Sequence, residues 1–270
     1  MWYLEFLDGL HRALRPPTYL EIGIRTGHSL ALSRCTSIGI DPAFQIKEEI
    51  ACEVALFRIT SDEYFERPAP LEPFAGRPIA LSFVDGMHLF EYALRDFINV
   101  EKHADWTSVI VFDDMLPRSV VEAARERETA AWTGDVYKMV AVLGRYRPDL
   151  RLVLVDTQPT GLLLVLGADP ENTVLRDSYD EIVAEFVTPD HGHVPGSLLR
   201  RKSAVAPRAL LASPLWQQLA DARTKGVSRR KGLKQLNRAV DDLLRGKSRP
   251  TGGARIKTGL RRRAKRLVTR

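Results

Sequence analysis

Apolar residues recur along the first two thirds of the chain in short runs, and segments with helical spacing separate these runs. The runs are rich in β-branched and other apolar residues, which favours strands. They stand at 18–22, 37–40, 54–59, 79–84 and 108–112. One intervening stripe with helical period consists of Leu89, Tyr92, Ala93, Phe97 and Val100. This alternation predicts parallel strands that are joined by helices.

The pattern closes with two apolar runs, at 150–155 and 162–166, joined by a short turn. So short a connection predicts an antiparallel pair, because parallel neighbours need a longer crossover. We therefore expect an α/β fold: a Rossmann-like doubly wound sheet of seven strands, of which the last is antiparallel.

Three regions follow from this pattern: an N-terminal helix at 1–17, a central domain at 18–188 and a C-terminal extension at 189–270. We expect the extension to be basic and partly helical or disordered. Within the central domain, the residue pattern also predicts helices over 45–50 and 117–131.

Charge is divided unevenly between these regions. Residues 223–270 contain 18 Lys and Arg against 2 acids, whereas the remaining 222 residues have a net charge of −10. The overall net charge of +6 therefore comes from the extension. Three interpretations remain open: a solvated tail, contact with an anionic membrane or glycan surface, or contact with nucleic acid. The basic residues are not interleaved with aromatic ones, which disfavours a stacking platform for nucleic acid.

Nothing in the sequence indicates export. The N-terminus lacks a basic leader region and is interrupted by Glu5 and Asp8, and the longest apolar stretch is too short to span a bilayer. Cys35 and Cys52 have neither metal spacing nor a disulfide framework. We expect a cytoplasmic protein, with association at a membrane surface as a further possibility.

A glycine turn follows the first predicted strand, with Gly23 and Gly27 separated by three other residues. A dinucleotide-binding turn needs a further glycine for close approach to a pyrophosphate, and Arg25 occupies that place. Glu21 stands at the strand end, where an ammonium group could pair with it. Asp41 ends the second strand, where an acid accepts ribose hydroxyls. An amino acid joined to a nucleoside satisfies both acids, so we expect S-adenosylmethionine as cofactor.

Four segments at the ends of predicted strands are YLEIGIRTGHSL, IGIDP, ALSFVDGMHLFEYALRDF and VIVFDDMLP. Through these segments, residues 18–166 resemble a class I S-adenosylmethionine-dependent methyltransferase. The most similar group is the small-molecule and sugar O-methyltransferases, together with cephalosporin-hydroxylase-like and rhamnosyl O-methyltransferase-like proteins. The resemblance implies that the central domain binds this cofactor, and that the loop after the third strand, with Ser61 and Asp62, contacts adenine.

Acids also follow the fourth and fifth predicted strands: Asp85 in one case, Asp113 and Asp114 in the other. Parallel strands end at one edge of a sheet, so these carboxylates should lie together and could hold Mg²⁺. The spacing resembles that of metal-dependent O-methyltransferases, in which these positions are ligands. The alternative is that the acids only cap the following helices.

His88 follows Asp85 by three residues and has a side chain suited to accepting a proton near neutral pH. We expect His88 or Asp85 to deprotonate a hydroxyl of a sugar or another small molecule. Two other functions remain open. One is an NAD(P)-dependent oxidoreductase. The other is a non-catalytic protein that uses residues 223–270 to bind RNA or an anionic membrane.

Overall fold

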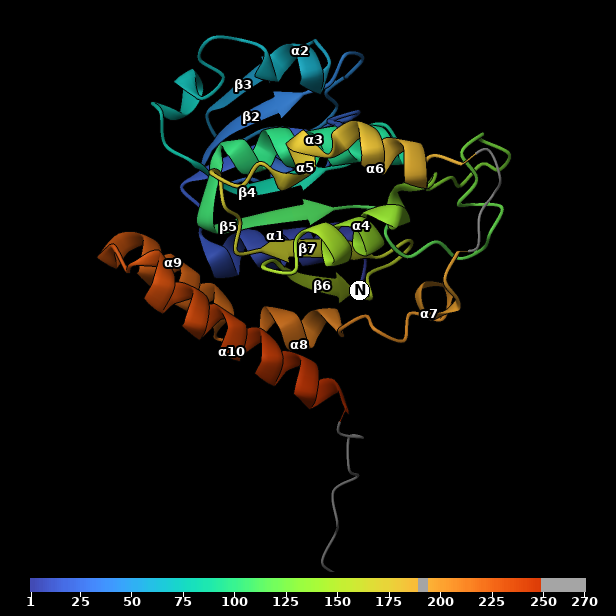
Figure 1. Cartoon of the computed structure of the whole chain (residues 1–270). Coiled ribbons are helices and arrows are strands. Elements are labelled where there is room, and N and C mark those ends of the chain that lie inside the picture. The colour runs from blue at the N-terminus through green and yellow to red at the C-terminus, as the bar shows by residue number, and fades with distance from the viewer. Residues whose placement is uncertain (189–193, 249–270) are drawn as a thin grey trace, which may run out of the picture.

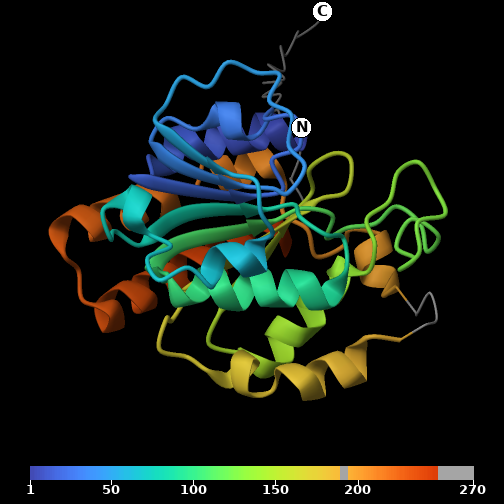
Figure 2. The ribbon, with the colours of Figure 1, turned by 90° about the horizontal axis from the view of Figure 1, so that it is seen from above.

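The computed structural model describes residues 1–188 and 194–248. A seven-stranded sheet forms its centre, with helices on both faces (Figures 1 and 2). The strand order is β3-β2-β1-β4-β5-β7-β6. Strands β1 to β5 are parallel, and β7 runs antiparallel to both β5 and β6. The predicted doubly wound sheet with an antiparallel strand is therefore confirmed.

The strands are β1 (Thr18–Ile22), β2 (Thr36–Ile40), β3 (Val54–Phe57), β4 (Ile79–Val84), β5 (Ala104–Phe112), β6 (Arg151–Val155) and β7 (Leu162–Leu166). The longer helices are α1 (Tyr3–Leu14), α3 (Phe90–Lys102), α4 (Met139–Tyr146), α6 (Tyr179–Phe186), α9 (Leu215–Lys225) and α10 (Arg229–Ser248). The shorter ones are α2 (Ser61–Phe65), α5 (Val174–Asp177), α7 (Gly196–Leu199) and α8 (Pro207–Leu211).

The hydrophobic core has two layers because alternate strand residues point to opposite faces of the sheet. Leu20 and Ile22 of β1 pack into the layer that contains α3, α4 and α6. Tyr19, next to Leu20 along the strand, packs into the layer that contains α1, α9 and α10. Strands buried on both faces explain the nearly continuous apolar runs of the sequence.

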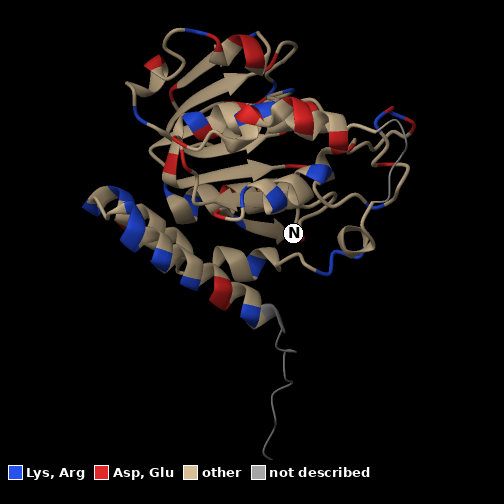
Figure 3. Cartoon of the chain, viewed as in Figure 1, with Lys and Arg blue, Asp and Glu red and all other residues tan. Residues whose placement is uncertain are grey.

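The described part of the C-terminal extension packs on the sheet. Trp216 of α9 is 1% exposed, and Leu236 and Val240 of α10 join the same core layer as α1. The opposite side of α10 is basic (Figure 3). The division of the chain into three regions stays a prediction, and residues 249–270 lie outside the described part.

Two predicted helices are wrong. Residues 117–131 and 45–50 form turns and loops. In the first segment Arg118 pairs with Glu122 at helical spacing, but Arg125 binds Glu91 and Asp135, which lie outside the segment. The apolar segment after Gly27 forms only a 3₁₀ turn at Leu30–Leu32. Among the described residues, no helix is long and apolar enough to cross a membrane.

The two sides of α10 should respond differently to truncation. Leu236→Ala should lower the free energy of unfolding by about 2–4 kcal/mol because it removes buried apolar atoms and leaves a cavity. Lys234→Ala, on the exposed side of the same helix, should change it by less than about 0.5 kcal/mol. Urea denaturation followed by tryptophan fluorescence measures both. Equal effects would mean that α10 does not belong to the core.

Candidate functional site

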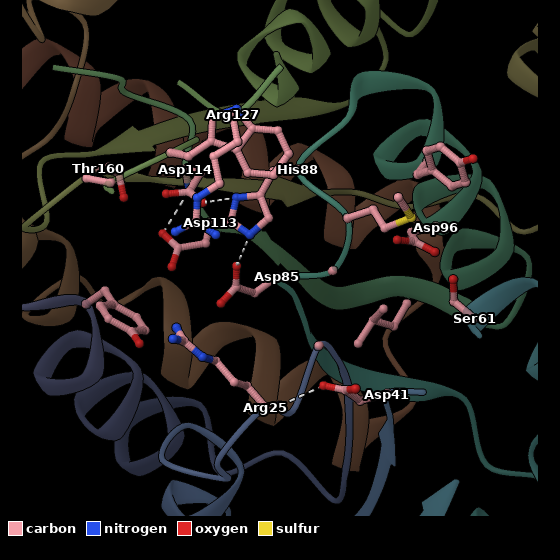
Figure 4. Close-up of a pocket in the computed structure, with 18 of the residues that line it drawn as sticks. Arg25, Asp41, Ser61, Asp85, His88, Asp96, Asp113, Asp114, Arg127 and Thr160 are labelled. Atoms are coloured by element: carbon pink, nitrogen blue, oxygen red, sulfur yellow. Dashed lines mark hydrogen bonds and ion pairs between the residues drawn. The ribbon is translucent and has the colours of Figure 1, made fainter. Parts of the chain in front are cut away.

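A cavity of about 680 Å³ opens at the carboxyl ends of the parallel strands (Figure 4). Its size lies in the range of pockets that enclose small ligands. One end is lined by residues that follow β1, β2 and β3: Gly23, Arg25, Asp41, Ser61 and Asp62. The other end is lined by residues that follow β4 and β5: Asp85, His88, Asp113 and Asp114. The topology thus brings all but two of the predicted site residues, Glu21 and Gly27, to one cavity.

Gly23 lets β1 approach the end of β4. Its φ is +90°, and a Cβ atom there would lie 1.9 Å from the main-chain oxygen of Asp85. Backbone hydrogen bonds hold the turn on both sides, from Gly23 N to Ile40 O and from Asp85 N to Ile22 O. Gly27, with φ +85°, completes the turn. Gly23 therefore fixes how closely the two strand ends approach each other.

Asp41 fixes the glycine turn at the end of β2. Its Oδ2 accepts a hydrogen bond from Arg25 N at 2.7 Å, and its Oδ1 accepts one from Ala43 N at 2.6 Å. The carboxylate lies on the wall of the cavity, and each oxygen retains a lone pair for a ligand. The Arg25 side chain extends over the cavity from the same turn.

Glu21 does not reach the cavity. It is fully buried beneath the turn, where its carboxylate accepts hydrogen bonds from the hydroxyls of Tyr19 and Ser29, both at 2.6 Å. Burial raises the pKa of Glu21 to about 7, although the two hydrogen bonds oppose this shift. Glu21 is therefore placed to support the glycine turn from below, because Ser29, which donates to its carboxylate, lies two residues after Gly27.

Ser61 and Asp62 begin α2 at the end of the cavity beyond Asp41. The Asp62 carboxylate pairs with Arg95 at 2.7 Å. The buried carboxyl of Asp96, on α3, lies on the same wall next to Ser61 (Figure 4). Burial raises the pKa of Asp96 to about 7, and a hydrogen bond with Ser61 opposes that shift.

The sequence interpretation missed Asp96. A signal was available, because Asp96 falls on the apolar stripe of its helix, between Ala93 and Val100. An acid at such a position is buried, and its carboxyl then needs a specific environment. Tyr3 and Trp132 also line the cavity, although both come from outside the strand–helix repeats.

The other end of the cavity holds a cluster of two carboxylates and an imidazole. His88 lies between Asp85 and Asp114: Nδ1 is 2.6 Å from Asp114 Oδ2, and Nε2 is 3.7 Å from Asp85 Oδ1 (Figure 4). One donor atom of each residue lies within 4.8 Å of the other two. Asp113 lies beside the cluster, and its Oδ1 accepts the backbone N–H of Asp114.

These acids lie close together, Asp113 buried and Asp85 and Asp114 partly buried. Burial raises the pKa of Asp85 well above its usual range, and the charges of Asp113 and Asp114 raise it further. Burial and the charge of Asp114 also raise the pKa of Asp113. Neighbouring carboxylates repel one another, so a bound cation would relieve this repulsion.

The wall around the cluster comes from three distant segments. Tyr3 of α1 stacks on Phe83, and its ring lines the cavity. Trp132 stacks on His88, with the ring centroids 5.3 Å apart and an interplanar angle of 23°. Pro159 and Thr160, between β6 and β7, complete the wall. The imidazole is therefore held in position from one face.

No protein-family model and no curated protein matches the sequence. Solved structures with a similar fold include the O-methyltransferase from Bacillus cereus in complex with S-adenosylhomocysteine, at 16% identity over 61% of this chain and 80% of that one, with a TM-score of 0.43. Another is the O-methyltransferase TomG from Streptomyces achromogenes, involved in tomaymycin synthesis and in complex with S-adenosylmethionine, at 18% identity, 62% and 79% coverage and a TM-score of 0.44.

A third is the methyltransferase PaMTH1 from Podospora anserina, bound to S-adenosylhomocysteine, at 13% identity, 62% and 78% coverage and a TM-score of 0.42. Each of these is one of the proteins that the chain is similar to. At such identities the chemistry of this chain has to follow from the residues of its own cavity.

Gly23→Ala should lower the free energy of unfolding by about 3 kcal/mol or more, because the new methyl group would meet the main chain of Asp85 at a positive φ. Gly76→Ala is the matched control. Gly76 also has a positive φ, of +74°, but no atom lies within 4 Å of the place that its new methyl group would take, so the cost should be about 1 kcal/mol. Thermal unfolding compares the two. Equal losses would show that the approach of β1 to β4 is not constrained at Gly23.

Glu21→Gln should change how stability depends on pH. A buried carboxyl whose pKa is raised to about 7 stabilises the fold fully below the unfolded value of 4.5 and loses this contribution as pH rises through 7. The variant should therefore gain up to about 3 kcal/mol relative to the native protein between pH 5 and pH 8. Urea denaturation at both pH values measures the gain. Glu49→Gln, at an exposed carboxylate, is the control, and an equal gain there would contradict the prediction.

Proposed function

We propose that the protein is an S-adenosylmethionine-dependent O-methyltransferase that acts on a hydroxyl of a small molecule with the help of a divalent metal ion. One observation carries this proposal: a single cavity joins the glycine turn and Asp41 to the cluster of Asp85, His88 and Asp114. The first end suits a nucleoside with an amino-acid side chain, and the second suits a hydroxyl that must lose its proton.

The residues that we propose to bind the cofactor lie at different places along the cavity, and each would contact a different part of the cofactor. Asp41 would accept the ribose hydroxyls through the lone pairs that its backbone contacts leave free. Ser61 and Asp62 would lie at the adenine end, with Asp96 on the same wall. Gly23 and Gly27 shape the turn over which the amino-acid portion would lie, and Glu21 supports that turn from below. Bound S-adenosylmethionine supplies an electrophilic methyl group.

The acceptor half of the cavity would orient the hydroxyl toward that methyl group. Holding the two reacting groups in line accounts for much of the acceleration in such a transfer. His88 and Asp85 lie at the strand end where the hydroxyl would sit, so either can receive its proton. Tyr3 and Trp132 provide aromatic walls that suit the rings of a sugar or an aromatic acceptor.

The donor groups at this end fit a divalent cation. Two carboxylates and an imidazole converge, and the buried Nδ1 of His88 has no aligned hydrogen bond despite its short distance to Asp114. Asp85 and Asp114 would hold the ion, with Asp113 next to them. A bound cation supplies positive charge that lowers the pKa of an acceptor hydroxyl. Mg²⁺ is the ion that the sequence pattern suggests.

The cavity is less suited to NAD(P). A pyrophosphate is normally held by the N-terminus of a helix that follows the glycine turn. Here the turn leads into Leu30–Leu32, a single 3₁₀ turn, and Arg25 takes the place of the middle glycine. We also propose that the protein is cytoplasmic. Its residues 223–270 would contact an anionic membrane or nucleic acid.

Calorimetric titration tests the proposed cofactor. S-Adenosylhomocysteine should bind and NAD should not. Asp41→Asn should weaken the binding of S-adenosylhomocysteine by about 10- to 100-fold, because hydrogen bonds to a charged acceptor are lost. Glu48→Gln, an exposed acid that does not line the cavity, should leave the affinity unchanged. Binding of NAD, or no binding of S-adenosylhomocysteine by the native protein, would refute the proposed function.

A further inference from the structure

The three groups nearest to one another at the acceptor end are Asp85, His88 and Asp114, rather than three carboxylates. Ligand atoms at neighbouring positions of an octahedral ion lie about 3 Å apart when the metal–ligand bonds are about 2.1 Å. Nδ1 of His88 lies 2.6 Å from Asp114 Oδ2, and one ligand atom of each of the three residues lies within 4.8 Å of the other two. Small side-chain rotations would bring the three donor atoms to the spacing of metal ligands.

Asp113 is oriented differently. Its Oδ1 accepts the N–H of Asp114, which ties the carboxylate to the turn after β5. Asp114 has a φ of +63°, a left-handed conformation that turns the backbone between the two acids. The turn thereby directs Asp114 toward His88 and leaves Asp113 outside the group of three.

The His88 ring and its backbone are restrained by neighbouring groups. Trp132 stacks on its face. The backbone behind it is also fixed, since a Cβ atom at Gly134 would lie 1.6 Å from the carbonyl oxygen of His88. The Nδ1 atom is buried and makes no well-aligned hydrogen bond. An imidazole that is restrained in this way needs little reordering to bind an ion.

We infer that His88 is a ligand of the metal ion together with Asp85 and Asp114, and that this mixed set selects a first-row transition ion such as Mn²⁺ or Co²⁺ over Mg²⁺. The inference rests on the proposed function and identifies the ion of that same site. Mg²⁺ prefers oxygen ligands, whereas an imidazole nitrogen strengthens binding along the transition series. A ring nitrogen that binds metal cannot take the proton of the acceptor, so under this inference the proton would go to a carboxylate and not to His88.

The first measurement needs no variant. Mn²⁺ is titrated into the full-length native protein and bound ion is followed by electron paramagnetic resonance, with Mg²⁺ as competitor. Mn²⁺ should bind at least about tenfold more tightly than Mg²⁺. Pulsed measurements on the bound ion should show coupling to an imidazole ¹⁴N nucleus. No binding of Mn²⁺, or bound Mn²⁺ without nitrogen coupling, overturns the inference.

Variants identify the nitrogen. His88→Ala should remove the ¹⁴N coupling, weaken Mn²⁺ binding by about 10- to 100-fold and abolish the preference over Mg²⁺. Asp113→Asn should keep the coupling and bind Mn²⁺ within about threefold of the native protein. His28→Ala, at an exposed histidine paired with Glu48, is the matched control for losing an imidazole. If Asp113→Asn abolishes binding while His88→Ala does not, the three-carboxylate site is correct and the inference is wrong.

Titration with S-adenosylhomocysteine on the same samples separates this inference from the proposed function. Tight binding of S-adenosylhomocysteine without nitrogen coupling to Mn²⁺ overturns only the role of His88. Absence of both overturns the methyltransferase proposal as well. Circular dichroism of each variant confirms that a loss of metal affinity is not a loss of fold.

Discussion

The approach of the β1 end to the β4 end is the constraint on which the rest of the site depends. Only a residue without a side chain fits between Ile22 and the main chain of Asp85, as the 1.9 Å separation at Gly23 shows. This contact places Asp41 on one side of the turn and Asp85 on the other, within one cavity. A glycine that the sequence pattern assigns to ligand binding thus acts first on the spacing of two strands.

Much of this arrangement could be predicted from the sequence, because it follows from periodicity and from strand ends. Apolar runs buried on both faces indicated the strands, and residues directly after them, such as Asp41 and Asp85, had to lie at one edge of the sheet. What could not be predicted depends on distant contacts. Residues 117–131 have a helix-like composition, yet they form a loop in which Arg125 binds Glu91 and Asp135 outside the segment. Propensity is a weak guide where such ion pairs decide the backbone.

The same limit applies to the cluster at the acceptor end. The sequence places three acids there, but it does not indicate which of them face one another. That depends on the left-handed backbone at Asp114 and on the ring of Trp132, which lies 44 residues beyond His88. Likewise, Glu21 was expected to meet a ligand, and instead its carboxylate is enclosed by Tyr19 and Ser29. Position along a strand indicates the neighbourhood of a side chain, whereas its partners are set by loops that have no periodic signal.

Helix α10 links the charge of the extension to the stability of the whole chain. Its inner side, with Leu236 and Val240, is part of the core, while Arg230, Lys231, Lys234 and Arg238 on its outer side are exposed and have no ion-pair partner in the described parts of the chain. These four like charges repel one another on a helix that the fold needs. If a polyanion neutralised them and bound the folded chain more tightly than the unfolded one, occupancy of that surface and resistance to unfolding would rise together.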